Sequence, residues 1–165
     1  MNIAVGSVRS RYDAEDLGDD RVGVALDPRP VFTHMRLDPK LLRPVTAAHG
    51  GKRTVRYRRA LRPEMFRTNW GYVDHLVLPP DASEGLHRHD FIEEFYYVIN
   101  GRGRVTVDKE TAEIGPGDAV PIRLREAHGF YNHTQQDLEL LVVGITLEKG
   151  KFDFTDLGDD LAKAR

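Results

Sequence analysis

The chain has 165 residues, a formal net charge of -2, 40% apolar and 30% charged side chains, and no cysteine. The lack of cysteine excludes disulfides and thiolate metal sites, and the small net charge gives no general affinity for nucleic acid or an anionic membrane. No apolar run approaches the roughly 20 residues of a membrane span. We therefore expect a cytoplasmic protein with neither a nucleic-acid partner nor a membrane partner.

A basic segment lies in the N-terminal part of the chain. Between residues 40 and 67 there are nine basic side chains and one acidic side chain. Within it, T-V-R-Y-R-R predicts a strand with Arg56 and Arg58 on one face. Three interpretations stay open: a solvated edge strand protected by its charges, a clamp for an anionic substrate, or a contact surface in a homodimer.

Short apolar strands alternate with turns from residue 70 to residue 147. The run W-G-Y-V-D-H-L-V-L ends at two prolines, F-Y-Y-V-I ends at Asn100-Gly101, and further short runs continue to Thr146. About eight or nine such strands, with almost no helical periodicity, favour an antiparallel sandwich or barrel. We predict an all-β barrel over 70–147. Residues 1–69 are expected to form an arm and strands that pack on it or on a second subunit, and 148–165 a tail across its outside.

The strand pattern also indicates a metal site. His87 and His89 are two residues apart, so both imidazoles leave an extended strand by the same face, and Glu94 follows on the next strand. Two imidazoles and a carboxylate from neighbouring strands suit a first-row metal ion. A later segment, G-D-A-V-P-I-R-L-R-E-A-H-G-F-Y-N, would add the imidazole of His128.

These two segments resemble the two motifs of the cupin superfamily, the double-stranded β-helix jelly rolls. The first motif, G-x5-H-x-H-x(3,4)-E-x6-G, is matched by His87, His89, Glu94 and Gly101. The second motif, G-x5-P-x-G-x2-H-x3-N, is matched by Gly117, His128 and Asn132. The resemblance covers roughly residues 70–147. It implies a jelly-roll barrel with one divalent metal ion held by the three histidines and the glutamate. Iron(II) is favoured, and manganese, nickel, copper and zinc suit the same donors.

Other residues near these motifs are candidates for contact with a substrate. Arg123 and Arg125 stand where the second motif has proline and glycine. If that stretch is extended, both guanidiniums lie on one side, either as rim charges or as forks onto an anionic substrate. Tyr96 shares the face of Glu94, so it is a candidate acid–base group or a packing residue. Phe130 shares the face of His128 and is a candidate substrate contact.

Function is not fixed by this resemblance, because cupins include oxygenases, isomerases, epimerases, lyases and binding modules. The first expectation is a metal-dependent enzyme that acts on a small, polar, anionic metabolite by iron(II)-dependent oxygenation. The runner-up is a sugar or sugar-phosphate isomerase or epimerase, in which Arg123 and Arg125 hold phosphate. The third is a metal- and ligand-binding module without catalysis. A homodimer is expected in each case.

Overall fold

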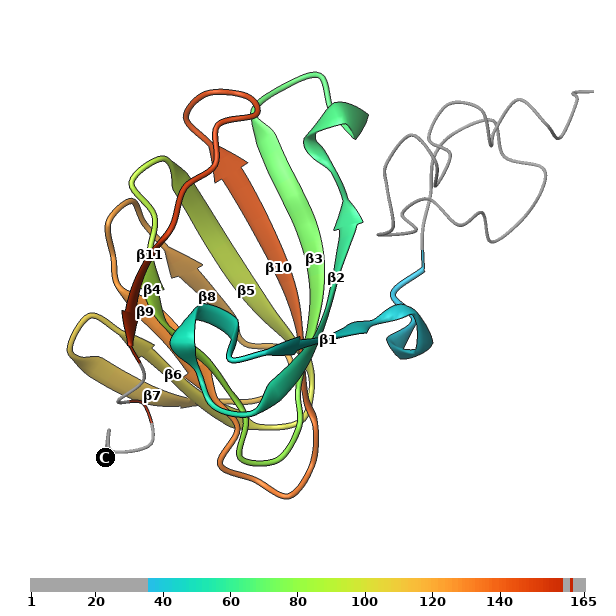
Figure 1. The fold of residues 1–165 in the computed structure, drawn as a ribbon, viewed down its shortest axis with the longest axis vertical. Helices are drawn as coiled ribbons and strands as arrows, with labels where there is room; N and C mark the ends of the chain where they lie inside the picture. Colours follow the sequence, from blue (N-terminus) through green and yellow to red (C-terminus); the bar gives the residue numbers. More distant parts are fainter. Residues whose placement is uncertain (1–35, 159–160, 162–165) are drawn as a thin grey trace, which may run out of the picture.

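Residues 36–158 and residue 161 are described by the computed structural model, and they form two antiparallel sheets that face each other (Figure 1). The six-stranded sheet has the order β1-β2-β3-β10-β5-β8, and the five-stranded sheet has the order β11-β4-β9-β6-β7. The predicted all-β jelly-roll fold is confirmed. The part of the predicted N-terminal arm before residue 36 lies outside the described residues.

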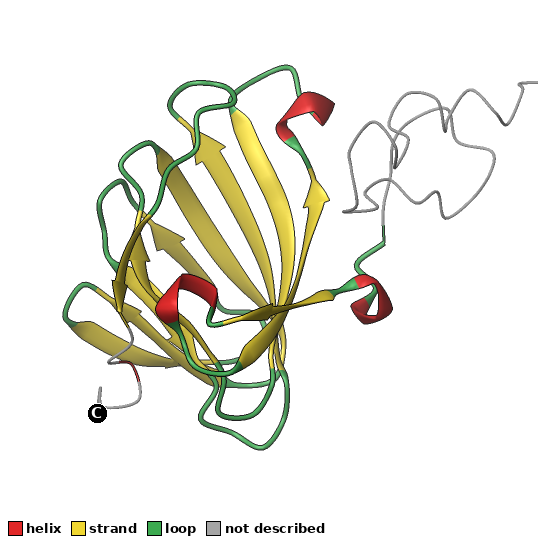
Figure 2. Cartoon of the chain, in the orientation of Figure 1, coloured by secondary structure: helices red, strands yellow, loops and turns green. Residues whose placement is uncertain are grey.

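Strands make up most of the described chain, with short 3-10 turns before the first strand and between the next two pairs (Figure 2). The strands are β1 (Arg43–Thr46), β2 (Thr54–Leu61), β3 (Trp70–Leu78), β4 (Ser83–Arg88), β5 (Ile92–Asn100), β6 (Gly103–Val107), β7 (Glu110–Ile114), β8 (Ala119–Ile122), β9 (His128–Tyr131), β10 (Leu138–Thr146) and β11 (Thr155–Gly158). The turns are η2 (Pro39–Leu41), η3 (Ala48–Gly50) and η4 (Pro63–Met65). Among the described residues, no helix is long and apolar enough to cross a membrane.

Alternation along β5 shows how the sequence fills the barrel. Ile92, Tyr96 and Val98 are buried between the sheets, whereas Phe95 and Tyr97 lie on the outer face and are more than a third exposed. Both sheets contribute further apolar side chains to this core, among them Leu76, Leu78, Val105, Phe130, Leu138 and Leu140. The inward face of β5 therefore contributes Tyr96 and Val98 to the core, and it also carries Glu94.

Segments from both ends of the described chain add strands to the barrel. β2 pairs with β3 in the six-stranded sheet, and β1 extends that sheet by one more strand. β11 pairs with β4 and covers the edge of the five-stranded sheet, where backbone N–H and C=O groups need partners. The C-terminal segment is thus part of the barrel wall and does not simply lie across its outside.

Two glycines allow η3 to lie tightly against β4. A Cβ at Gly85 would lie 2.1 Å from the backbone oxygen of His49, and a Cβ at Gly51 would lie 2.3 Å from the backbone oxygen of Ser83. No larger residue fits at either position without moving the backbone. This close approach brings His49 next to His87.

Candidate metal centre and adjoining cavity

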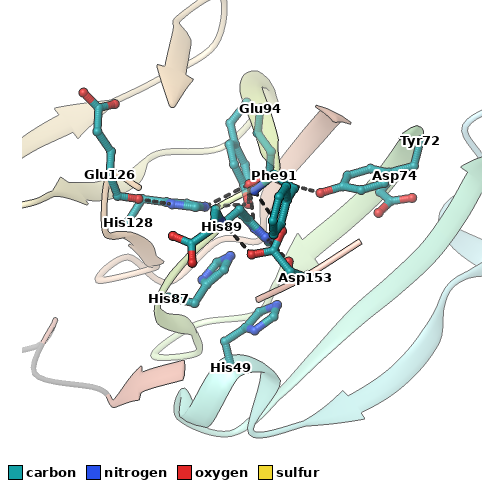
Figure 3. A network of polar contacts seen from close by, with 12 residues as sticks. His49, Tyr72, Asp74, His87, His89, Phe91, Glu94, Glu126, His128 and Asp153 are labelled. Atoms are coloured by element: carbon teal, nitrogen blue, oxygen red, sulfur yellow. Dashed lines mark hydrogen bonds and ion pairs between the residues drawn. The ribbon is translucent and has the colours of Figure 1, made fainter. Parts of the chain in front are cut away.

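Four donor side chains meet inside the barrel, and their ligand atoms lie within 4.8 Å of one another (Figure 3). His87 lies near the end of β4, His89 follows that strand, Glu94 is on β5 and His128 begins β9. The pairing of β4 with β9 sets His87 opposite His128. All four side chains are buried, so we call them the four-donor cluster and treat it as an interior site.

Each imidazole of the four-donor cluster is oriented by a backbone carbonyl. Nδ1 of His87 lies 2.8 Å from the oxygen of Gly85, and Nδ1 of His128 lies 3.2 Å from the oxygen of Glu126. Nδ1 of His89 bonds the carbonyl oxygen of Asp153. A carbonyl only accepts hydrogen bonds, so Nδ1 carries the proton in each ring and Nε2 presents a lone pair.

The lone pairs of two of these rings face the carboxylate of Glu94. Its Oε2 lies 2.9 Å from Nε2 of His128 and 3.3 Å from Nε2 of His89. Nε2 of His89 is buried and has no hydrogen-bond partner among the described residues. Facing acceptors repel unless a proton or a cation lies between them, and three imidazoles with one carboxylate suit a divalent ion. The residues present therefore fit a metal ion.

Two tyrosines hold the carboxylate of Glu94 in place. The hydroxyl of Tyr72 donates to Oε1 at 2.5 Å, and that of Tyr96 donates to Oε2 at 3.3 Å. Burial and the charge of Glu94 raise the pKa of Tyr72 well above its ordinary value, so the phenol stays a donor. Partners that bond a metal ligand in this way fix its orientation and tune its affinity.

A cavity of about 490 Å³ opens beside the four-donor cluster. Apolar side chains make up much of its wall, including Val45, Val55, Leu76, Ile92, Val142, Phe152 and Phe154. His87, His89 and Glu94 line it at one side, and Tyr96 lines it with them. Burial lowers the pKa of His87 to about 2, so its imidazole is neutral and available as a ligand.

Arg59 brings a positive charge to the same cavity. Its guanidinium makes a bidentate ion pair with Asp74, with Nε 3.1 Å from Oδ1 and Nη2 3.2 Å from Oδ2. It also lies over the ring of Tyr72, 4.3 Å from the centroid. Burial, opposed by the charge of Arg59, raises the pKa of Asp74 to about 6. Nη1 of Arg59 makes no hydrogen bond to the described part of the chain, which leaves it available to a ligand.

A second group of donors borders the first. His49, Glu84 and His87 have ligand atoms within 4.8 Å of one another, and all three line the cavity. The ring of His49 stacks on that of His87 with 3.8 Å between centroids. Burial raises the pKa of Glu84 to about 8.

Comparison with known proteins agrees with this geometry. Residues 74–144 match the family described as cupin domain. Over 103 residues the chain is 31% identical to the oxalate-binding protein of Thermotoga maritima, which spans 62% of this chain and 85% of that protein. The chain belongs to the cupin superfamily. A crystal structure of a predicted oxalate decarboxylase from Thermotoga maritima superposes with a TM-score of 0.64 at 29% identity, covering 68% of this cupin and 100% of that chain.

Two further relatives carry names from polyketide synthesis. The polyketide synthase CurC of Streptomyces cyaneus is 26% identical over 105 residues, which is 64% of this cupin and 65% of that protein. The structure of the polyketide cyclase RemF from Streptomyces resistomycificus superposes with a TM-score of 0.58 at 23% identity, covering 78% of this cupin and 89% of that chain. The second likeness shows the shared fold alone.

The two arginines ahead of His128 lie away from the cavity of this cupin. β8 ends at Ile122, and residues 123–127 form a turn instead of the extended stretch assumed from the sequence. The side chain of Arg125 is 77% exposed and approaches Asp90 at 3.8 Å, and Arg123 is exposed as well. Neither arginine lines the cavity.

The other predicted substrate contacts also lie outside the cavity wall. Arg56 makes an ion pair with Asp137 at the surface. Arg58 is 3% exposed, and its Nη1 donates to the backbone oxygen of Arg36 at 3.5 Å. Phe130 packs in the core against the ring of Tyr96, 4.1 Å between centroids. Among the predicted catalytic and substrate residues, the structure places Tyr96 alone in the cavity wall.

Three of the cavity residues that the sequence analysis did not predict were missed for different reasons. Arg59 shares a strand face with Val55 and Tyr57, so extending the alternation by two residues would have found it. Glu84 would lie opposite His87 on a regular strand, but a register shift in β4 between them turns both toward the cavity. His49 lies on a 3-10 turn, and no periodic signal marks it.

Proposed function

We propose that this cupin is a metal-dependent enzyme that acts on an anionic organic molecule bound between the four-donor cluster and Arg59. One observation carries the proposal: His87, His89 and Glu94 line the same cavity as Arg59, and Nη1 of Arg59 is left without a partner in the described chain. A guanidinium suits a carboxylate or an enolate oxygen because it presents several donors in a planar fork.

Size and polarity of the cavity favour a substrate with an apolar body. A volume of about 490 Å³ falls in the range of small-molecule sites and far exceeds that of a two-carbon diacid. Apolar walls, such as those formed by Val55, Ile92 and Phe152, exclude water from the bound molecule. The name of the Thermotoga relative, an oxalate-binding protein, supports a carboxylate as the anchoring group.

The chain's own groups then have distinct tasks. Arg59 binds the anionic end of the substrate, and Asp74 holds the guanidinium in position. Tyr72 and Tyr96 keep the Glu94 carboxylate turned toward the three imidazoles. A bound divalent ion would supply Lewis acidity and, as iron(II), redox chemistry with dioxygen. We propose iron(II)-dependent oxygenation as the reaction, with manganese, nickel, copper and zinc as the alternative ions.

Oxygen uptake by the iron(II)-loaded protein tests this reaction. Carboxylate probes of increasing apolar size, from oxalate to phenylacetate and naphthoate, would first be ranked by their affinity for the zinc-loaded protein. We expect the tightest probes to give oxygen uptake with iron and none with zinc. Equal turnover under nitrogen would contradict oxygenation, and failure of every anionic probe to bind would contradict the proposed substrate class.

A second candidate reaction is a ring closure or isomerisation that needs no dioxygen. The size of the cavity favours it, and so does the similarity to a polyketide synthase over 105 residues. In this case the zinc-loaded protein would be active under nitrogen, and solvent deuterium would appear at a substrate carbon. The same measurements test the two remaining candidates. Sugar-phosphate isomerisation predicts solvent deuterium in the substrate without any need for dioxygen, and a binding module predicts no turnover at all.

A further inference from the structure

Neither His49 nor Glu84 has a task in the proposed reaction, yet both are held beside a metal ligand. His49 comes from η3, before the segment that matches the cupin family, and Glu84 comes from β4. Their ligand atoms and that of His87 lie within 4.8 Å of one another. This group shares His87 with the four-donor cluster but lies on the side of His87 nearer to η3.

One side-chain oxygen of buried Glu84 has no hydrogen-bond partner among the described residues. Its side chain is only 9% exposed, and Oε2 makes no hydrogen bond within the described part of the chain. An unpartnered buried carboxylate oxygen is costly and is usually explained by a missing water or ion. The imidazoles of His49 and His87 are candidate ligands for an ion shared with Glu84.

His49 is arranged as the three cluster imidazoles are. Its Nδ1 bonds Oδ1 of Asp156 at 2.9 Å, so Nε2 is left with a lone pair on a ring that lines the cavity. The backbone of His49 is left-handed, with φ 50, a conformation that costs a non-glycine residue of order 1 kcal/mol or more. Gly85 and Gly51 make room for this turn against β4. The local structure therefore accepts strain that keeps the imidazole beside Glu84.

We propose that His49, Glu84 and His87 form a second cation position in the cavity, for a first-row divalent ion, which is used as an alternative to the four-donor cluster. Nδ1 of His87 donates to the carbonyl of Gly85, so this ring has a single free nitrogen. That nitrogen cannot serve two ions at once. One ion per chain is expected, placed on either side of His87, and this proposal holds whatever the substrate is.

Cobalt(II) binding to a variant with a damaged first position tests the proposal. His89→Ala together with His128→Ala leaves the four-donor cluster with two donors and leaves the second position complete. We expect this variant to bind one cobalt(II) per chain, and we expect Glu84→Gln or His49→Ala added to it to weaken binding at least about tenfold. Glu110→Gln, an exposed change on β7, is the matched control and should leave binding unchanged.

Two results would overturn the second position. One is a folded double variant that binds no cobalt, and the other is cobalt binding that is indifferent to both Glu84→Gln and His49→Ala. Thermal melting of each variant checks that it is folded. If the double alanine change prevents folding, His89→Gln together with His128→Gln, which keeps more of the side-chain volume, replaces it with the same additions and the same expected losses.

Discussion

The direction of each lone pair is what makes the three histidines, together with Glu94, fit a metal ion. Strand alternation and motif spacing were enough to predict His87, His89, Glu94 and His128, because those features fix which side of a strand a side chain leaves. They could not predict Tyr72 or the carbonyl of Asp153, which reach Glu94 and His89 only through tertiary contacts. The donor residues can therefore be predicted from the sequence, whereas the groups that hydrogen-bond to them and orient them cannot.

Tyr72→Phe is expected to lower the affinity for a divalent ion about tenfold or more, because it removes the hydroxyl that fixes Oε1 of Glu94. Competition with a chromophoric chelator measures this affinity. Tyr97→Phe is the control, since Tyr97 lies on the outer face of β5 and is 40% exposed. Equal affinities in the two variants would show that Tyr72 does not support the ligand.

Arg59→Ala is expected to weaken carboxylate binding to the zinc-loaded protein by about 1.5–3 kcal/mol, the usual value of a hydrogen bond to a charged group. Titration calorimetry with the tightest probe measures the loss, and zinc content should stay unchanged. Arg123→Ala is the control because this arginine lies outside the cavity. If Arg123→Ala weakened carboxylate binding and Arg59→Ala did not, the result would favour the prediction that Arg123 and Arg125 bind the anionic substrate.

At the scale of elements, the segment from Phe152 to β11 joins the cavity wall to the metal ligands. Phe152 and Phe154 line the cavity, the carbonyl of Asp153 holds His89, and Asp156 holds His49. A short tail of mixed composition gave no sign of this, because its partners are more than sixty residues away in the chain. The same limit applies to β2, because its basic composition does not show that Arg59 faces the cavity.

Asp153→Ala is expected to reduce both stability and metal affinity. The side chain of Asp153 accepts from the backbone N–H groups of Asp90 and Phe91, so its loss should lower the free energy of unfolding by about 1–3 kcal/mol. Loss of these bonds would also move the carbonyl of Asp153 that orients His89, so metal affinity should fall. Urea unfolding and metal titration measure the two effects, and Asp137→Ala at the surface is the control. A change in stability with intact metal affinity would show that the segment does not orient His89.

For the whole molecule, the strand pattern predicted the all-β barrel because alternating burial and turns are local signals. The turn at 123–127 was not predicted, since the motif spacing is compatible with either an extended or a turned backbone. The sheet order that brings β2 beside β3 depends on long-range pairing and is likewise invisible to periodicity. The expected homodimer and the cytoplasmic location stay predictions.

Metal removal should lower the thermal stability of the whole barrel, because the donors are buried and acceptors face one another without the ion. A ligand at 100 times its Kd stabilises the folded state by about 2.7 kcal/mol. For a chain of this size, that corresponds to a Tm lower by about 5–10 °C after treatment with a chelator. Calorimetric scans with and without zinc measure it, and equal Tm values would contradict metal binding in the barrel.

Anomalous X-ray scattering from crystals grown with one equivalent of cobalt(II) tests the metal centre most directly. We predict that the strongest peak lies among His87, His89, Glu94 and His128. A map with no peak among these four side chains, or with its strongest peak away from both donor groups that contain His87, would contradict the proposed metal centre.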